Sequence, residues 1–201
     1  ICVELFSPKN INCIGVIGTG VQARMQIAYL PENINCKKIK VWGRSDKSVD
    51  LYIQEMTSQG WEIEGTNNID EIASTCDLII TTTPSKEPLL TNKFLKKGTH
   101  INAIGSDSSE KNELKSDVLK SADLIVADSI SQCLDIGEIS HAIRNKDIDA
   151  HDVQELGNLI HENRTYNCKD SQLSIADLTG VAVQDIQIAK AVFKECEKLK
   201  T

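Results

Sequence analysis

The chain has 201 residues, with 22 Lys and Arg against 29 Asp and Glu, so its formal net charge is −7. This acidic balance, with only three Phe, two Trp and three Tyr, excludes the basic, aromatic-rich surfaces of nucleic-acid binders. No apolar run reaches the roughly 18–20 residues of a membrane helix, and no basic segment followed by an apolar stretch opens the chain. We therefore expect neither a nucleic-acid partner nor a membrane.

The seven cysteines are odd in number and scattered, without a CxxC pair or a Cys/His cluster at metal-ligand spacing. We accordingly expect reduced thiols, no bound metal and a cytoplasmic location. The chain opens on Ile1 and not on Met, so we also expect it to be a fragment or a trimmed form of a longer protein.

From the N-terminus onward, short apolar runs alternate with amphipathic stretches, which is typical of a parallel sheet with helices on its faces. In chain order, the first part predicts strand Ile11–Gly18, helix Val21–Leu30, strand Lys38–Trp42, helix Lys47–Gln59, strand Trp61–Glu64 and helix Ile69–Ser74. Three further strands are predicted at Asp77–Thr82, Thr99–Ile104 and Asp123–Ala127.

After Asp128 the pattern turns helical and polar, which predicts helices over Ile136–Arg144, Val153–Ile160 and about 180–199, with a loop from Asn163 to Asp170. No repeat or low-complexity tract interrupts the chain. We therefore predict one α/β domain with a doubly wound parallel sheet over residues 1–201.

The first predicted strand runs directly into a glycine turn that matches G-x-G-x-x-G/A, Gly18-Thr19-Gly20-Val21-Gln22-Ala23. Such a turn lets the backbone approach a pyrophosphate, and the following helix offers free N–H groups and the positive end of its dipole. An ordinary glycine-rich turn is the alternative interpretation. Because this turn follows the first strand of an alternating β/α chain, we predict dinucleotide binding.

The residues after the second predicted strand bear on which dinucleotide binds. Such sites usually carry Asp or Glu there to hold the ribose 2′-hydroxyl, whereas this chain has Arg44 and Ser45. Because the planar arginine fork suits a phosphate, we predict a preference for NADP(H) over NAD(H). In the alternative interpretation, Arg44 is a solvated loop residue and Asp46 turns toward the ribose.

Five segments together resemble the ornithine cyclodeaminase/mu-crystallin family. They are Gly18-Thr19-Gly20-Val21-Gln22-Ala23, Val41-Trp42-Gly43-Arg44-Ser45, Thr81-Thr82-Thr83-Pro84, residues 97–107 and Gly180-Val181-Ala182-Val183-Gln184-Asp185. The resemblance implies a Rossmann-type NAD(P)-binding domain of an enzyme that moves a hydride at the α-carbon of an amino acid or its imine. Members include ornithine cyclodeaminases, which convert L-ornithine to L-proline and ammonia, alanine dehydrogenases and ketimine reductases.

The resemblance also implies roles for individual residues. It makes Asp107 the acid/base carboxylate, although a plain turn residue is the alternative for that position. Lys111 is expected near the cofactor, and Glu113 near the start of the next helix, where it could equally be a structural carboxylate. The implied cofactor-binding residues are Gly18, Thr19, Gly20, Val21, Gln22, Arg44, Ser45, Thr83, Lys111 and Thr179.

Two departures from the family pattern stand out. Near the nicotinamide, members commonly have a serine where this chain has Leu178 followed by Thr179. Members also carry, before the glycine turn, a region that forms a homodimer and binds the substrate carboxylate, whereas here only Ile1–Asn10 precede the first strand. We expect the apolar residues of the last helix to meet such a domain or subunit. A non-catalytic binding protein of mu-crystallin type is the alternative function.

Overall fold

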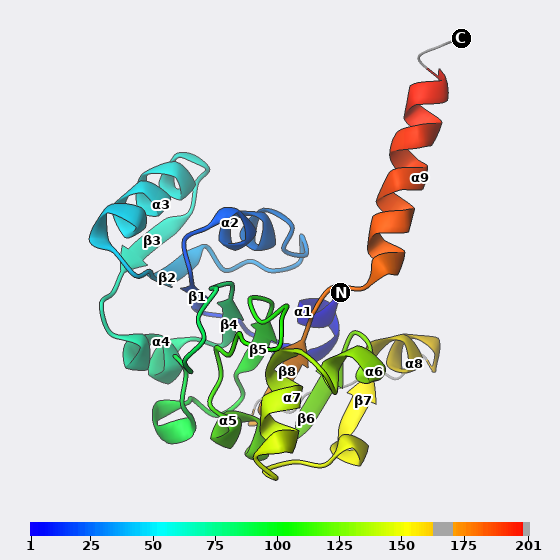
Figure 1. Cartoon of the computed structure of the whole chain (residues 1–201). Helices are drawn as coiled ribbons and strands as arrows, with labels where there is room; N and C mark the ends of the chain where they lie inside the picture. The colour runs from blue at the N-terminus through cyan, green and yellow to red at the C-terminus, as the bar shows by residue number, and fades with distance from the viewer. Residues whose placement is uncertain (163–170, 199–201) are drawn as a thin grey trace.

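The computed structural model describes residues 1–162 and 171–198, which form an eight-stranded parallel sheet in the order β3-β2-β1-β4-β5-β8-β6-β7 (Figure 1). The strands are β1 Ile14–Ile17, β2 Lys38–Trp42, β3 Glu62–Gly65, β4 Leu78–Thr81, β5 His100–Ala103, β6 Leu124–Ala127, β7 Val153–Glu155 and β8 Ser174–Asp177. The predicted doubly wound α/β fold is confirmed.

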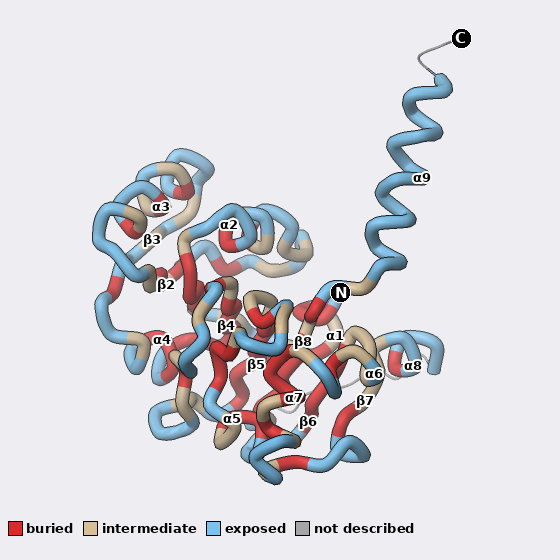
Figure 2. The backbone as a smooth tube through the Cα atoms, in the orientation of Figure 1, coloured by how far each residue is buried: buried red, intermediate tan, exposed pale blue. Residues whose placement is uncertain are grey.

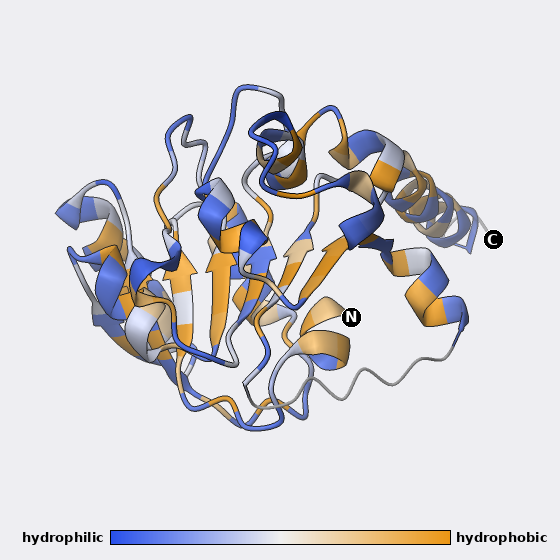
Figure 3. Cartoon of the chain, turned by 90° about the horizontal axis from the view of Figure 1, so that it is seen from below, coloured by the Kyte–Doolittle hydropathy of each residue, from blue (hydrophilic) through white to orange (hydrophobic). Residues whose placement is uncertain are grey.

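Helices cover both faces of the sheet. They are α1 Cys2–Phe6, α2 Val21–Ala28, α3 Asp46–Ser58, α4 Ile69–Thr75, α5 Ser116–Lys120, α6 Ile130–Cys133, α7 Gly137–Arg144, α8 Leu156–His161 and α9 Ala182–Lys198, with short 3₁₀ turns at η1 Asn92–Phe94 and η2 Ala150–Asp152. Apolar residues of α2 and α3 share a cluster on one face, and those of α4, α5 and α7 share a cluster on the other. Figure 3 shows the apolar strands between these two layers.

Every residue of β1, β4, β5, β6 and β8 is buried, as the red strands in Figure 2 show. In β1, Ile14 and Val16 belong to the cluster under α2 and α3, while Ile17 belongs to the opposite cluster. A strand covered on both faces needs apolar residues at successive positions, which explains the continuous runs in the sequence.

The strand order places a switch point between β1 and β4. From β1 the chain moves outward through β2 and β3, then returns to add β4 and β5 on the other side of β1. The two connections leave the sheet in opposite directions, and in open α/β sheets the carboxyl ends of the strands at such a point are where a crevice for ligands is expected. The glycine turn after β1 lies at this crevice.

Two predictions for the second half of the chain are wrong. The segment predicted as one helix, Val153–Ile160, is strand β7 followed by helix α8, and no strand was predicted where β8 pairs with both β5 and β6. Strand β8 reads Ser-Ile-Ala-Asp, so its polar ends hide the apolar signal, and its position comes from tertiary pairing. The loop predicted at 163–170 lies outside the described residues.

Helix α9 extends away from the sheet (Figure 1) and has no buried residue. Its apolar side chains Val183, Ile186, Ile188, Val192 and Phe193 are each more than half exposed. Among the helices within residues 1–162 and 171–198, none combines the length and the apolar character that a membrane crossing needs.

Candidate functional site

The glycine turn leaves space and hydrogen-bond donors at the carboxyl end of β1. Gly18 has a φ of +120°, and a Cβ there would lie 2.5 Å from the hydroxyl oxygen of Thr82. At Gly20 a Cβ would meet nothing within 4 Å, and this residue is the N-cap of α2, where no side chain caps the helix. The turn therefore fits the pyrophosphate of a dinucleotide, since open space and uncapped N–H groups are what that anion needs.

The Arg24 side chain hydrogen-bonds the backbone of the glycine turn. Its Nη1 donates to the carbonyl oxygens of Thr19 and Gly20, and its Nε pairs with Glu55. Its guanidinium lies 5.2 Å from the centre of the Tyr52 ring. Sequence analysis missed this residue because Tyr52 and Glu55 are on the next helix, and no local pattern ties them to the turn.

The end of β2 lies beside the glycine turn, since a Cβ at Gly43 would come within 2.8 Å of the Thr19 side chain. Arg44, Ser45 and Asp46 are all exposed there. The Ser45 hydroxyl caps α3 by accepting from the Ser48 N–H at 3.4 Å. Both the arginine and the neighbouring carboxylate are thus free to meet the ribose end of a cofactor.

Asp107 forms an ion pair with Lys111 in the loop after β5. Their Oδ1 and Nζ atoms are 2.5 Å apart, and the side chains are 56% and 28% exposed. The loop is closed on itself, because the Ser106 hydroxyl donates to the Lys111 carbonyl at 2.6 Å and His141 Nε2 lies 2.9 Å from the same oxygen. The structure therefore joins two of the predicted site residues and holds them at an accessible edge.

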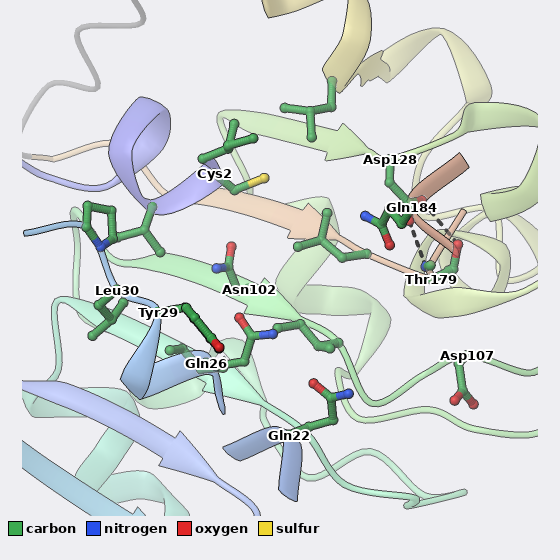
Figure 4. Close-up of a pocket in the computed structure, with 18 residues that line it drawn as sticks. Cys2, Gln22, Gln26, Tyr29, Leu30, Asn102, Asp107, Asp128, Thr179 and Gln184 are labelled. Atoms are coloured by element: carbon green, nitrogen blue, oxygen red, sulfur yellow. Dashed lines mark hydrogen bonds between the residues drawn. The ribbon is translucent and has the colours of Figure 1, made fainter. Parts of the chain in front are cut away.

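A cavity of about 510 Å³ opens between α1, α2 and the carboxyl ends of β5 and β8 (Figure 4). Three predicted site residues line it, namely Gln22, Asp107 and Thr179, and so does Asn102, which sequence analysis did not single out. The predicted cofactor residues that do not line it are Gly18, Thr19, Gly20, Val21, Arg44, Ser45, Thr83 and Lys111.

Thr179 turns its hydroxyl toward Asp128 rather than leaving it free (Figure 4). The hydroxyl donates to Asp128 Oδ1 at 3.1 Å and accepts from Gln132 Nε2 at 2.8 Å. The other carboxylate oxygen of Asp128 accepts from the Gly180 N–H at 2.7 Å. Asp128, absent from our predicted site, therefore anchors the turn between β8 and α9 at the cavity rim.

Glu113 is fully buried, and its carboxylate accepts hydrogen bonds from residues at the ends of β4 and β5. Its carboxylate accepts from the Thr81 hydroxyl at 2.7 Å, from the Thr83 N–H and hydroxyl at 2.5 and 2.7 Å, and from the Gly105 N–H at 2.9 Å. Burial raises the pKa of Glu113, opposed by these four donors. Glu113 lies before α5, and its carboxylate hydrogen-bonds the strand ends rather than the first turn of that helix. The Thr83 hydroxyl, predicted to contact the cofactor, donates to Glu113 here.

Two more buried carboxylates continue this arrangement. Glu138 accepts from the N–H groups of Glu113 and Leu114 at 2.8 and 2.9 Å, and burial raises its pKa to about 7. Asp177 accepts from the Ile139 N–H at 2.8 Å through Oδ2, while its Oδ1 is buried without a hydrogen-bond partner among the described residues. Burial, followed by the nearby Glu138, raises the pKa of Asp177 well above its usual value.

His100, in β5, is completely buried. Its Nδ1 lies 2.8 Å from the Ser174 hydroxyl and its Nε2 lies 2.9 Å from Asn102 Oδ1. Burial lowers the pKa of His100 to about 4, so the ring is neutral at pH 7. This ring fixes the amide of Asn102, which lines the cavity.

Asp149, His151 and Asp152 bring ligand-type atoms within 4.8 Å of one another, and all three are exposed. The two carboxylates already form the capping box of η2, in which Asp152 accepts from the Asp149 N–H at 2.8 Å. This helix-end chemistry accounts for the cluster.

Known proteins resemble this chain over nearly its whole length. The profile of the ornithine cyclodeaminase/mu-crystallin family matches residues 1–200. This chain belongs to that family. The chain is 33% identical over 195 residues to an alanine dehydrogenase of Archaeoglobus fulgidus, covering 96% of the chain and 60% of the relative. An uncharacterized cyclodeaminase of Sinorhizobium fredii is 32% identical, covering 98% of this chain and 60% of that protein.

Solved structures of relatives share the fold over the whole chain. An archaeal alanine dehydrogenase dimer with bound NAD has a TM-score of 0.91 at 31% identity, covering all of this chain and 62% of that one. The Thermococcus litoralis Δ1-pyrroline-2-carboxylate reductase in complex with NADH and L-proline has a TM-score of 0.92 at 25% identity, covering all of this chain and 62% of that one. This chain therefore spans about 60% of the length of the relatives it matches.

Proposed function

We propose that this chain is the NAD(P)-binding part of an enzyme that transfers a hydride at the α-carbon of an amino acid or its cyclic imine, in the manner of ornithine cyclodeaminase. The observation that carries the proposal is the combination, at one sheet edge, of an open glycine turn and the Asp107–Lys111 pair. Membership of a family whose relatives include dehydrogenases and imine reductases supports it.

In this proposal, the residues at the sheet edge have separate roles. Gly18, Gly20 and the first N–H groups of α2 bind the pyrophosphate. A nicotinamide cofactor held by these groups would supply the hydride chemistry. Asp107 takes a proton from the substrate ammonium, so that the nitrogen lone pair assists hydride departure, and Lys111 holds the Asp107 carboxylate in place.

A titration of this chain with NADPH and NADH tests the cofactor part of the proposal, which includes a preference for NADP(H). Arg44 is exposed beside the turn, so we expect Arg44→Ala to weaken NADPH binding by about tenfold and to leave NADH binding unchanged. Lys47→Ala, an exposed cation three residues along, is the matched control. Equal affinities for the two cofactors in the unchanged chain contradict the NADP(H) preference and favour Asp46 as the reader of the ribose.

The chemical part is tested in the full-length protein with Asp107→Asn, which removes the base but keeps the size of the side chain. We expect turnover of amino acids and cyclic imines to be lost while cofactor affinity stays unchanged. Turnover that survives this change contradicts the role of Asp107. Cofactor binding without any turnover in the unchanged protein favours the non-catalytic function of mu-crystallin type.

We further propose that residues 1–201 act as one cofactor-binding domain and that α9 packs against another domain or subunit of a cytoplasmic homodimer. The exposed apolar side chains of α9 support this assembly, because a surface of this kind favours burial. Light scattering of this chain, combined with an apolar dye, tests it. A clean monomer that binds no dye counts against it.

A further inference from the structure

A pair of thiols lies at the amino end of the sheet, opposite the edge that holds the glycine turn. Cys13 directly precedes β1, and Cys76 follows α4 and directly precedes Asp77 and β4. Their sulfur atoms are 3.4 Å apart, although 63 positions separate the residues in sequence. The pair therefore bridges the two strands that flank the switch point.

Hydrogen bonds fix the backbone on both sides of the pair. The Asp77 N–H donates to the Cys13 carbonyl at 3.0 Å, and Asp77 Oδ2 accepts from the Cys13 N–H at 3.3 Å. Lys96 pairs with the other oxygen of Asp77 at 2.6 Å, and the Cys76 N–H donates to the Ile72 carbonyl at 3.0 Å. Because both backbones are held, the closeness of the sulfurs is built into the fold.

The two thiols differ in reactivity. Cys13 is half-buried and Cys76 is fully buried. A hydrogen bond between the Cys76 and Cys13 sulfurs, together with the charge of Lys40, lowers the pKa of Cys13, against burial and the charge of Asp77. The same hydrogen bond, followed by burial, raises the pKa of Cys76. Cys13 is thus the thiolate that an oxidant meets first, and Cys76 is the thiol beside it.

We propose that Cys13 and Cys76 are a reversible disulfide site that a peroxide oxidises. The Cys13 thiolate attacks one oxygen of hydrogen peroxide, the O–O bond breaks, and the second oxygen leaves as hydroxide, which is protonated to water. The Cys76 sulfur then attacks the Cys13 sulfenic acid, and the S–S bond forms. The departing hydroxide combines with the proton of the Cys76 thiol, so two thiols and one peroxide give one disulfide and two waters.

This cross-link closes the segment from β1 to α4, which includes the glycine turn and the end of β2. A disulfide that closes a long loop restricts the unfolded chain, so the oxidised form resists unfolding. The link lies at the amino ends of the strands, whereas the glycine turn lies at their carboxyl ends. We therefore expect stability to change and cofactor affinity to stay the same, whichever cofactor the enzyme uses.

Peptide mapping after peroxide treatment tests the site. The 201-residue chain is treated with hydrogen peroxide, the remaining thiols are alkylated, and the protein is digested without reductant. We expect a linked peptide containing Cys13 and Cys76, and a melting temperature raised by about 5–10 °C that returns to its starting value with dithiothreitol. Cys13→Ser should abolish both effects.

Cys36→Ser is the matched control, because Cys36 is another buried thiol that donates only to a backbone carbonyl, that of Lys38. This variant should still form the linked peptide. Treatment that yields Cys13 sulfinic acid, or disulfides between other pairs, overturns the proposal. A Cys13–Cys76 peptide without any rise in melting temperature overturns its stabilising role.

Discussion

Two regions at the same edge of the sheet differ in whether their backbone N–H groups already have hydrogen-bond acceptors. At the glycine turn, Gly20 precedes α2 and offers no side-chain cap, and the space around that residue is open. Beyond β4, buried carboxylates accept from the N–H groups of Thr83, Gly105, Glu113, Leu114 and Ile139.

The difference separates a stretch whose N–H donors are open to a ligand from one whose N–H donors are already bonded to buried carboxylates of the chain. Uncapped donors with open space suit a phosphate brought by a ligand. Donors already bonded to Glu113, Glu138 and Asp177 hold the loops beyond β4 in place, among them the one that carries Asp107. The cost of this second arrangement is the burial of three carboxylates, because the charge of Glu138 interacts unfavourably with the charges of both Glu113 and Asp177.

Among the changes proposed here, removal of the Glu113 carboxylate should have the largest effect on stability. Glu113→Ala leaves the N–H groups of Thr83 and Gly105 without an acceptor, so we expect the free energy of unfolding to fall by about 3 kcal/mol or more. Urea unfolding followed by circular dichroism measures it. Glu110→Ala removes an exposed carboxylate three residues away and should leave the free energy of unfolding almost unchanged. Equal losses of unfolding free energy in Glu113→Ala and Glu110→Ala contradict the role of Glu113 in holding these loops.

Asp177→Asn should stabilise the protein at high pH. The raised pKa of Asp177 means that the folded state holds a proton more tightly than the unfolded state, so this group lowers stability as the pH rises above the unfolded value of about 4. Asparagine keeps an acceptor for the Ile139 N–H and carries no charge.

We expect the Asp177→Asn variant to be more stable than the unchanged chain by about 1 kcal/mol at pH 8, and less dependent on pH between 5 and 8. Melting temperatures at the two pH values measure this. The exposed Asp135→Asn is the control and should leave the pH dependence as it is. A variant that is less stable at pH 8 shows that the carboxylate is satisfied in the fold.

Gly20→Ala should have the smallest effect on stability and a clear effect on binding. A methyl group at this position meets no protein atom, so we expect the free energy of unfolding to change by less than about 0.5 kcal/mol. The methyl fills space that the pyrophosphate needs, so NADPH affinity should fall by about tenfold. Gly157→Ala, which also enters open space, should leave affinity unchanged. Unaltered binding in Gly20→Ala removes the turn from the cofactor site.

Sequence analysis predicted the glycine turn, the fold class and the family because each depends on local spacing within a short stretch. It missed Glu138 and Asp177, and it left Glu113 undecided between a site residue and a helix-end carboxylate. Glu113 and Glu138 act on N–H groups that lie 8 to 30 positions away in sequence. Asp177 receives its donor from 38 positions away. The hydrophobic periodicity of a sequence does not predict hydrogen bonds between residues that far apart.

The sequence by itself determined the alternation of strands and helices, the tight turn at Gly18 and the uncapped start of α2, since these follow from backbone geometry and neighbouring residues. Tertiary structure alone decided that β8 enters between β5 and β6, and that Cys13 and Cys76 meet across two strands. The physical reason is that a polar or thiol side chain can be buried only where it finds a hydrogen-bond partner. When that partner lies far away in sequence, the two side chains meet only once the strands have paired.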